Sequence, residues 1–244
     1  DSDEAAVRAL IAREKPDVIV HTAALSNTAY CASHPEESLR ATVLLPEWIA
    51  KAAAETGAKL LAFSSDQVYA GCKESGPLPE TLSLAPTNVY GCHKLEAEQR
   101  VLAITPGAVL LRAAWMYDFP GYRLPIRGNL PLNLLSAAKT GTALHFSEHD
   151  FRGVSYVREV IDKLIPAMEL PGGVYNFGSG NDCDMFETVS RFARLLGVEV
   201  PLEKDHWERN LVMSGEKLKD FGIRFDSTIQ AFQQCLDDYG FGRS

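Results

Sequence analysis

Helical and apolar segments alternate along the first 118 residues. Val7, Leu10 and Ile11 share one face of a helix, and a short apolar run at 18–20 follows a Lys-Pro-Asp break. The pattern predicts helices at 3–14, at 36–55 and from about residue 88, and strands at 18–20, 59–63 and 108–112. Because these strands are apolar throughout rather than at alternate positions, we expect helices on both faces of the sheet. This order of elements predicts right-handed crossovers and an α/β fold with a doubly wound parallel sheet.

The pattern changes after residue 118. Glycine and proline make residues 118–128 irregular. Beyond them, the pattern predicts helices at 130–139, 156–168, 185–196 and 227–238, and strands near 144–146 and 174–177. We therefore expect two parts. Residues 1–118 form the larger domain, and residues 119–244 form mainly a smaller α/β substrate-binding region that is interleaved with the core of the sheet.

Charge and cysteine content narrow the function classes. The net charge of −8 and the absence of any segment rich in Lys and Arg argue against a nucleic-acid or anionic-membrane surface. The five cysteines show neither a Cys-x-x-Cys pair nor the Cys/His spacing of a zinc site. We expect reduced thiols, no metal site and a cytoplasmic location. The longest apolar runs are too short to span a bilayer, and no targeting segment is recognisable.

Tyr90 and Lys94 are the first candidates for chemistry. They stand at i and i+4 in the helix that begins near residue 88, so both side chains lie on the same face. A free phenol with a pKa of about 10 is a poor proton-transfer group at neutral pH. A neighbouring ammonium favours the phenolate, so we expect Lys94 to lower the pKa of Tyr90. The alternative is a surface helix with an unrelated tyrosine and lysine.

Two strand ends carry further candidates. Ser65 follows the strand at 59–63 and could donate a hydrogen bond to a developing alkoxide, although Ser-Ser-Asp also closes ordinary turns. The residues at 21–24 follow the strand at 18–20, and the small ones among them let backbone approach a flat ligand. In doubly wound sheets, ligands bind at the carboxyl ends of the strands. These segments are therefore expected to meet at one site.

Four segments resemble the extended short-chain dehydrogenase/reductases, and among them the dTDP-4-dehydrorhamnose reductases. The segments are Lys15 to Ala24, Ser64 to Gly71, Pro86 to Glu96, and Leu111 to Tyr117. The last reads Leu-Arg-Ala-Ala-Trp-Met-Tyr and is similar to the family's Leu-Arg-Thr-Ser-Trp-Val-Tyr. This Arg-x-x-Trp pattern favours the reductases over generic epimerases. The resemblance covers nearly the whole chain.

The resemblance implies a Rossmann-like fold and NAD(P)H-dependent reduction of a nucleotide-linked 4-keto-6-deoxysugar. Tyr90 is then the proton donor, Lys94 its activator and ribose anchor, and Ser65 the hydrogen-bond partner of the carbonyl. The implied cofactor is NADP or NAD, and the residues expected beside it are Ala23, Ala24, Ser26, Ser64, Tyr90 and Lys94. The residues expected beside the nucleotide-sugar are Ser65, Trp115, Asn129, Arg152 and Arg209, the two arginines because guanidinium groups pair with phosphate oxygens.

Two departures from related patterns matter. Sugar-nucleotide dehydratases place Glu where this chain has Gln67, and an amide cannot accept and return a proton, so elimination of water is disfavoured. The family's Gly-x-x-Gly-x-x-Gly turn is absent from the sequence. Gly178-Ser179-Gly180 has Cys183 in the place of the third glycine and is a poor substitute. We therefore expect a Rossmann-like sheet that lacks its N-terminal strands.

Other functions remain open at this point. A nucleotide-sugar epimerase needs only the tyrosine and the cofactor. A regulatory relative is a further alternative, because the regulatory subunit of methionine adenosyltransferase also resembles these reductases and also reads Ser-Ser-Asp. The resemblance allows a homodimer, on which the sequence itself is silent. The choice between NADH and NADPH, the nucleotide and the sugar are likewise not readable from the sequence.

Overall fold

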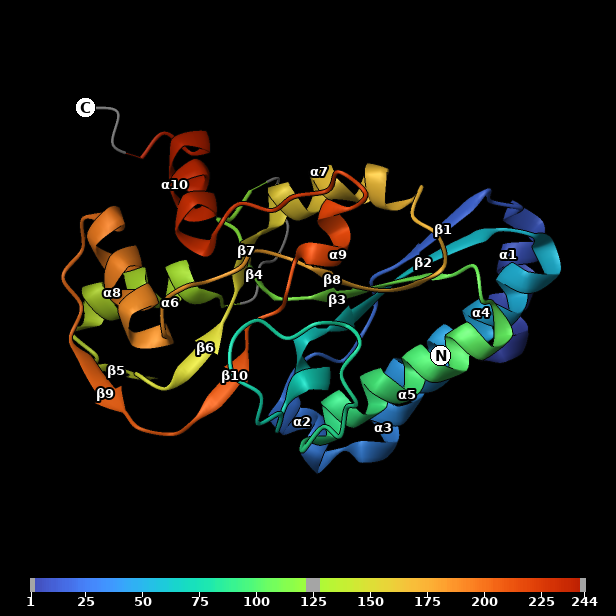
Figure 1. Cartoon of the computed structure of the whole chain (residues 1–244), viewed down its shortest axis with the longest axis horizontal. Helices are drawn as coiled ribbons and strands as arrows, with labels where there is room; N and C mark the ends of the chain where they lie inside the picture. Colours follow the sequence, from blue (N-terminus) through green and yellow to red (C-terminus); the bar gives the residue numbers. More distant parts are fainter. Residues whose placement is uncertain (1–2, 122–127, 242–244) are drawn as a thin grey trace.

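A computed structural model describes residues 3–121 and 128–241 (Figure 1). The helices are α1 (Glu4–Glu14), α2 (Thr28–Ser33), α3 (Pro35–Leu39), a π-helical turn (Arg40–Leu44), α4 (Leu45–Thr56), a 3₁₀ turn η2 (Asp66–Tyr69), α5 (Val89–Ile104), α6 (Leu130–Thr140), α7 (Val157–Ala167), α8 (Met185–Leu196), α9 (Glu216–Lys219) and α10 (Thr228–Asp238). The strands are β1 (Val18–His21), β2 (Lys59–Ser65), β3 (Val109–Ala113), β4 (Trp115–Tyr117), β5 (Leu144–Ser147), β6 (Asp150–Arg152), β7 (Val154–Tyr156), β8 (Gly173–Phe177), β9 (Leu202–Asp205) and β10 (Arg209–Leu211).

A four-stranded parallel sheet with the order β1-β2-β3-β8 forms the larger core. Alternate residues of β2 point to opposite faces: Leu60 packs with α1, α4 and α5, whereas Leu61 packs with α7 and α9. Figure 1 shows the two helical layers on either side of the strands. The α/β class and the parallel sheet predicted from the apolar runs are confirmed.

The fourth strand of this sheet comes from the C-terminal half of the chain. β8 pairs with β3 in parallel, from Val109 opposite Gly173 to Ala113 opposite Phe177. The chain thus leaves the sheet after β3, builds other structure and returns to it. The division at residue 118 remains a prediction, and the chain crosses between the two parts more than once.

The smaller part consists of three helices and short strand pairs. β4 pairs with β7, β5 with β9, and β6 with β10, all in parallel, and α6, α8 and α10 share a core with them. Buried rings at its centre include Tyr117, Phe192 and Phe232. Of these six strands, only β5 was predicted from the sequence. The sequence prediction for 118–128 falls partly on residues 122–127, which lie outside the described residues.

The helix predicted at 36–55 is confirmed as the unbroken helical run of α3, the π-helical turn and α4 at 35–56. The π-helical turn at 40–44 changes its hydrogen-bond pattern, and α4 carries Pro46 in its first turn. Proline has no N–H to donate to the carbonyl of Thr42 and its ring crowds that carbonyl, so the wider turn accommodates it. Asn27 caps α2, a short helix that the apolar pattern did not predict.

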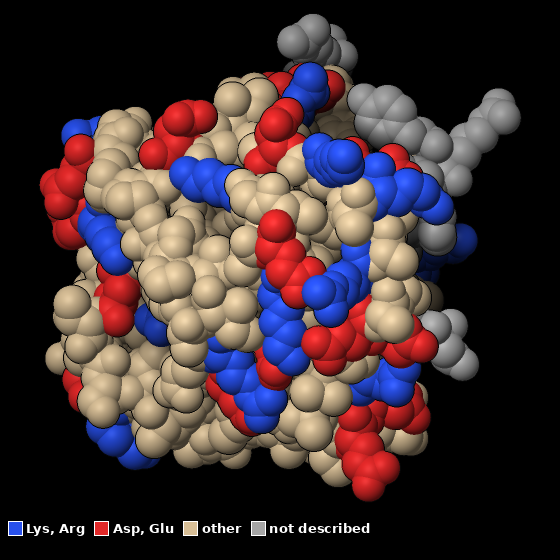
Figure 2. Space-filling model, turned by 90° about the vertical axis from the view of Figure 1, so that its right-hand side faces the viewer, with Lys and Arg blue, Asp and Glu red and all other residues tan. Residues whose placement is uncertain are grey.

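The surface formed by α1, α4 and α5 carries charges of both signs side by side (Figure 2). Exposed ion pairs there join Arg8 to Glu55, Lys51 to Glu4 and Arg100 to Glu96. Within the described residues, no helix has both the length and the apolar composition needed to cross a bilayer.

Candidate active site

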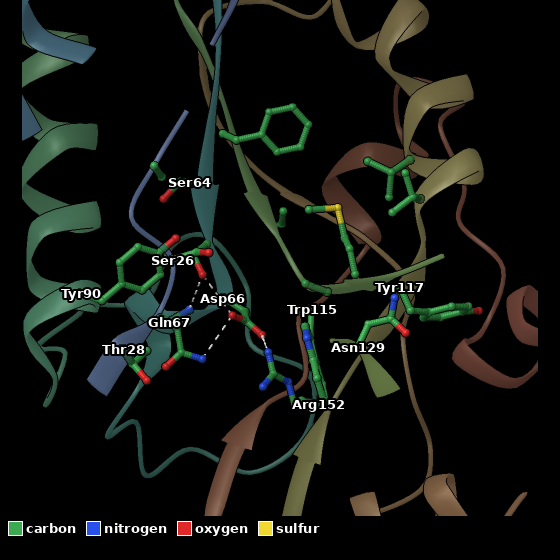
Figure 3. A pocket seen from close by; sticks show the side chains of 18 of the residues that line it. Ser26, Thr28, Ser64, Asp66, Gln67, Tyr90, Trp115, Tyr117, Asn129 and Arg152 are labelled. Atoms are coloured by element: carbon green, nitrogen blue, oxygen red, sulfur yellow. Dashed lines mark hydrogen bonds and ion pairs between the residues drawn. The ribbon is translucent and has the colours of Figure 1, made fainter. Parts of the chain in front are cut away.

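A cleft of about 940 Å³ opens at the carboxyl ends of β1, β2 and β3. Figure 3 shows side chains from both parts of the molecule pointing into it. We call Ser65, Tyr90 and Lys94 the floor of the cleft, and Trp115, Arg152, Trp207 and Arg209 its rim; all seven line it. Its position agrees with the rule that ligands bind at the carboxyl edge of a doubly wound sheet.

Tyr90 is placed by the start of α5. The side chain of Asn88 caps this helix by accepting a hydrogen bond from the N–H of Gly91 at 2.8 Å. A Cβ at Gly91 would lie 2.3 Å from the carbonyl oxygen of Gln67, so only glycine lets α5 approach η2 this closely. This approach brings Tyr90 and Ser65 together at the floor of the cleft, which both side chains line.

The environment of Tyr90 contradicts one expectation. Lys94 does not bind the phenol but donates a hydrogen bond to the carbonyl of Phe63 at 2.7 Å, with its ammonium 5.8 Å from the centre of the tyrosine ring. Burial is the dominant influence, and it raises the pKa of Tyr90 although the neighbouring Ser65 hydroxyl acts to lower it. The phenol is therefore protonated at neutral pH, as a proton donor must be.

Lys94 itself is strongly affected by its surroundings. Burial lowers its pKa to about 8, against the opposing influence of the Glu98 carboxylate. His21, at the end of β1, is also buried; burial and the nearby Lys94 charge lower its pKa to about 4. His21 is therefore neutral at pH 7, while Lys94 is the positive charge of the floor.

A buried polar network lies beneath the floor and escaped the sequence analysis. Ser64 donates a hydrogen bond to Glu98 at 2.5 Å, and Arg112 forms two hydrogen bonds with the same carboxylate at 2.9 and 2.7 Å. Arg112 also donates to the Tyr69 hydroxyl, which in turn donates to Asn176. The network joins β2, η2, α5, β3 and β8.

The residues expected beside the cofactor divide into two groups. Ala24 and Ser26 line the cleft, together with Thr22 and Thr28, which the sequence did not single out. Ser64 also lines the cleft, but its hydroxyl is engaged by Glu98, whereas Ala23 is exposed and outside the lining.

Arg152, the last residue of β6, lies at the rim of the cleft. Its guanidinium donates to Asp66, which is 2% exposed, at 2.6 Å and stands 5.2 Å from the centre of the Trp115 ring. Among the described residues, its Nε is one of the few buried polar side-chain atoms without a hydrogen-bond partner. Figure 3 shows Trp115 and Arg152 side by side. The free donor is a group that an incoming ligand could satisfy.

Arg209 and Asn129 are also engaged by protein groups. Arg209 forms two hydrogen bonds with Asp150 at 2.8 and 2.7 Å and stands 4.7 Å from the centre of the Trp207 ring. Asn129 caps α6 and donates its amide to the carbonyl of Asp118 at 2.7 Å. Trp207 was not predicted as a cleft residue from the sequence. The only local sign of its position was that it stands two residues before Arg209, which was predicted.

The cleft fits one end of a dinucleotide better than the other. Its volume is within the usual range of ligand sites, and the floor offers a buried ammonium and hydroxyls to a nicotinamide ribose. The Gly178 to Gly180 segment does not form a phosphate cradle: a Cβ at Gly178 would lie 2.7 Å from Ser155 and 2.9 Å from Ala114, so this glycine serves close packing. No other glycine-rich helix start occurs in the described parts of the chain.

Comparison with known proteins identifies the family. The family model described as RmlD substrate binding domain matches residues 2–204. The chain belongs to this RmlD family. Its relatives include the methionine adenosyltransferase 2 subunit beta of Xenopus laevis, 44% identical over 115 residues. That match covers 47% of this chain and only 34% of the relative's length. The dTDP-4-dehydrorhamnose reductase of Escherichia coli is 28% identical over 213 residues, covering 83% of this chain and 69% of that protein.

Solved structures confirm the RmlD-family fold. A dTDP-4-dehydrorhamnose reductase from Bacillus anthracis, in complex with NADP, matches 97% of this chain and 84% of its own with a TM-score of 0.87 and 17% identity. Solved structures with this fold hold NADP or NAD. The prediction of a Rossmann-like member of the sugar-nucleotide reductase group is thereby confirmed at the level of fold and family.

Proposed function

We propose that this RmlD-family chain carries the site for NAD(P)H-dependent reduction of a nucleotide-linked 4-keto-6-deoxysugar. The observation that carries the proposal is the meeting of Ser65, Tyr90 and Lys94 in one cleft, all three buried, with the ammonium of Lys94 one helical turn from Tyr90. The relatives support the same class of oxidoreductase.

The side chains of the floor divide the chemistry among them. Ser65 donates a hydrogen bond to the ketone oxygen, which polarises the carbonyl. The hydride for the carbonyl carbon comes from NADPH or NADH when one of them is bound. Tyr90 gives its proton to the oxygen as negative charge develops there, so the ketone becomes an alcohol. The positive charge of Lys94 stabilises the resulting phenolate and binds a ribose hydroxyl.

The rim supplies recognition of the nucleotide-sugar. Trp115 offers a flat apolar surface to the sugar ring, and Arg152 and Arg209 offer guanidinium groups to the diphosphate. Gln67 is hydrogen-bonded to Asp66 and Asn88 and provides no acid or base, which argues against elimination of water.

A turnover assay tests this proposal. Protein made from the complete reading frame, with any residues encoded before Asp1, is incubated with dTDP-4-dehydrorhamnose and either NADPH or NADH. We expect oxidation of one dinucleotide coupled to formation of the 4-hydroxy sugar, and a loss of about 10²- to 10⁴-fold in kcat for Tyr90→Phe. Tyr30→Phe, which alters an exposed phenol on α2, is the matched control. Absence of turnover, or turnover unaffected by Tyr90→Phe, rejects the proposal.

A regulatory role is the second candidate, favoured by the 44% identity to the methionine adenosyltransferase subunit beta over 115 residues. In that case, the protein should co-purify with a methionine adenosyltransferase catalytic subunit and change its activity. It should also fail to reduce the sugar. Epimerisation of the sugar without net oxidation of the dinucleotide would instead favour a nucleotide-sugar epimerase.

A further inference from the structure

A cluster of nitrogen and oxygen ligands lies on the smaller part, beyond the residues assigned to the reaction. β5 and β9 pair so that Ser147 is opposite Asp205, and the N–H of Glu148 continues the pairing by donating to the carbonyl of Asp205 at 3.2 Å. This register places Glu148 and His149, in the turn after β5, beside His206, which follows β9. One ligand atom from each of these three side chains lies within 4.8 Å of the others.

We propose that Glu148, His149 and His206 bind a divalent transition-metal ion of the zinc class. Two imidazoles and one carboxylate are a donor set that suits zinc, nickel or cobalt, whereas calcium and magnesium prefer oxygen ligands alone. Zinc–nitrogen bonds of about 2.0–2.1 Å place the ligand atoms of a tetrahedral ion about 3.4 Å apart. Small side-chain rotations therefore bring the three ligands from their present separation to metal-binding geometry.

The carboxylate of Glu148 is already oriented for this role. Its Oε1 lies 3.1 Å from Nδ1 of His206, while its Oε2 accepts a hydrogen bond from Lys204 at 2.7 Å. One oxygen is thus directed toward His206, and the other is held by Lys204. Hydrogen bonds of this kind orient metal ligands and tune their affinity. Because the two imidazoles are exposed, the remaining coordination position is open to water.

The site is connected to the rim of the cleft. His206 precedes Trp207, whose carbonyl accepts a hydrogen bond from Ser147 at 2.5 Å. His149 precedes Asp150, which holds Arg209. A bound ion would join the two segments that carry these rim residues, so metal binding is expected to change the environment of the Trp207 indole.

Metal titration of the intact chain tests the proposal. We expect calorimetry to show one zinc ion bound per chain, and affinity to fall at least tenfold in His149→Ala and in His206→Ala. His34→Ala, at the junction of α2 and α3, is the matched control and should bind like the unaltered chain. Cobalt should give a spectrum without a thiolate charge-transfer band, which separates this site from the cysteines. Circular dichroism of each variant confirms that it is folded.

A second measurement follows the link to the rim. Zinc should change the intrinsic fluorescence, the change should be reversed by a chelator, and it should be absent in Trp207→Phe although that variant still binds the ion. The proposal is overturned if the folded chain binds no zinc, if both histidine variants bind it with unaltered affinity, or if cobalt shows thiolate ligation. None of these outcomes depends on sugar reduction, so the proposal stands or falls separately from the proposed function.

Discussion

At the floor of the cleft, Ser65, Tyr90 and Lys94 are buried, and the polar groups beneath them form hydrogen bonds that span five elements of the larger core. At the rim, Arg152 and Arg209 lie on short strands of the smaller part, and each forms an ion pair with a single carboxylate. The difference indicates that the floor is held more rigidly than the rim. Under the proposed function, a rigid floor is preorganised for proton transfer, and the ion pairs of the rim would be exchanged for the phosphate oxygens of a ligand.

The largest expected effect on stability concerns the network beneath the floor. Glu98→Ala leaves the guanidinium of Arg112, which is 3% exposed, without its bidentate partner. Removing one partner of a buried ion pair typically costs about 3–5 kcal/mol, and we expect a loss in that range. Urea unfolding measures it. Glu98→Gln keeps an acceptor and should lose less; equal stability of the unaltered chain and Glu98→Ala would contradict a preorganised floor.

A smaller effect is expected from acid titration of His21. Its folded pKa is about 4, against about 6.5 when unfolded, so between these pH values the unfolded chain binds a proton that the folded chain does not. Stability is therefore lost as the pH falls from 6.5 toward 4. When the pH is lowered from 7 to 4.5, the free energy of unfolding should fall by about 2–3 kcal/mol less in His21→Gln than in the unaltered chain. Unfolding curves at both pH values measure this difference, and parallel losses in the two proteins would refute it.

The smallest effects belong to the rim and the outer surface. Asp150 is 3% exposed by side chain but its partner Arg209 is 30% exposed, so we expect Asp150→Ala to cost about 1–2 kcal/mol. The matched control is Glu55→Ala, which breaks the exposed pair with Arg8 and should cost less than about 1 kcal/mol. Thermal unfolding ranks the two variants. If Asp150→Ala lowered the stability of the protein as much as Glu98→Ala, the rim would contribute as much to stability as the network beneath the floor, which would contradict the comparison.

Local patterns predicted the parts of the molecule that depend on neighbouring residues. Three of the four sheet strands, β1, β2 and β3, contain an uninterrupted apolar run, and Tyr90 and Lys94 share a helix face by spacing alone. Partners that are distant in sequence were not predictable: Arg152 and Asp66 are separated by 86 residues, and no local pattern records their pairing. Three-residue strands such as β4 and β7 are too short to show a periodicity. The direction of the Tyr90 pKa shift was missed because it depends on burial.

The pairing of β3 with β8 has a consequence for the synthesis of the protein on the ribosome. Val109 and its partner Gly173 are 64 residues apart, so at about 5–20 residues per second the ribosome needs about 3–13 s to deliver the last strand of the sheet. During that interval, β3 is an apolar edge with unsatisfied backbone groups, the kind of surface that promotes aggregation. The order in which its strands are made thus sets a period of several seconds in which aggregation of the growing chain is favoured.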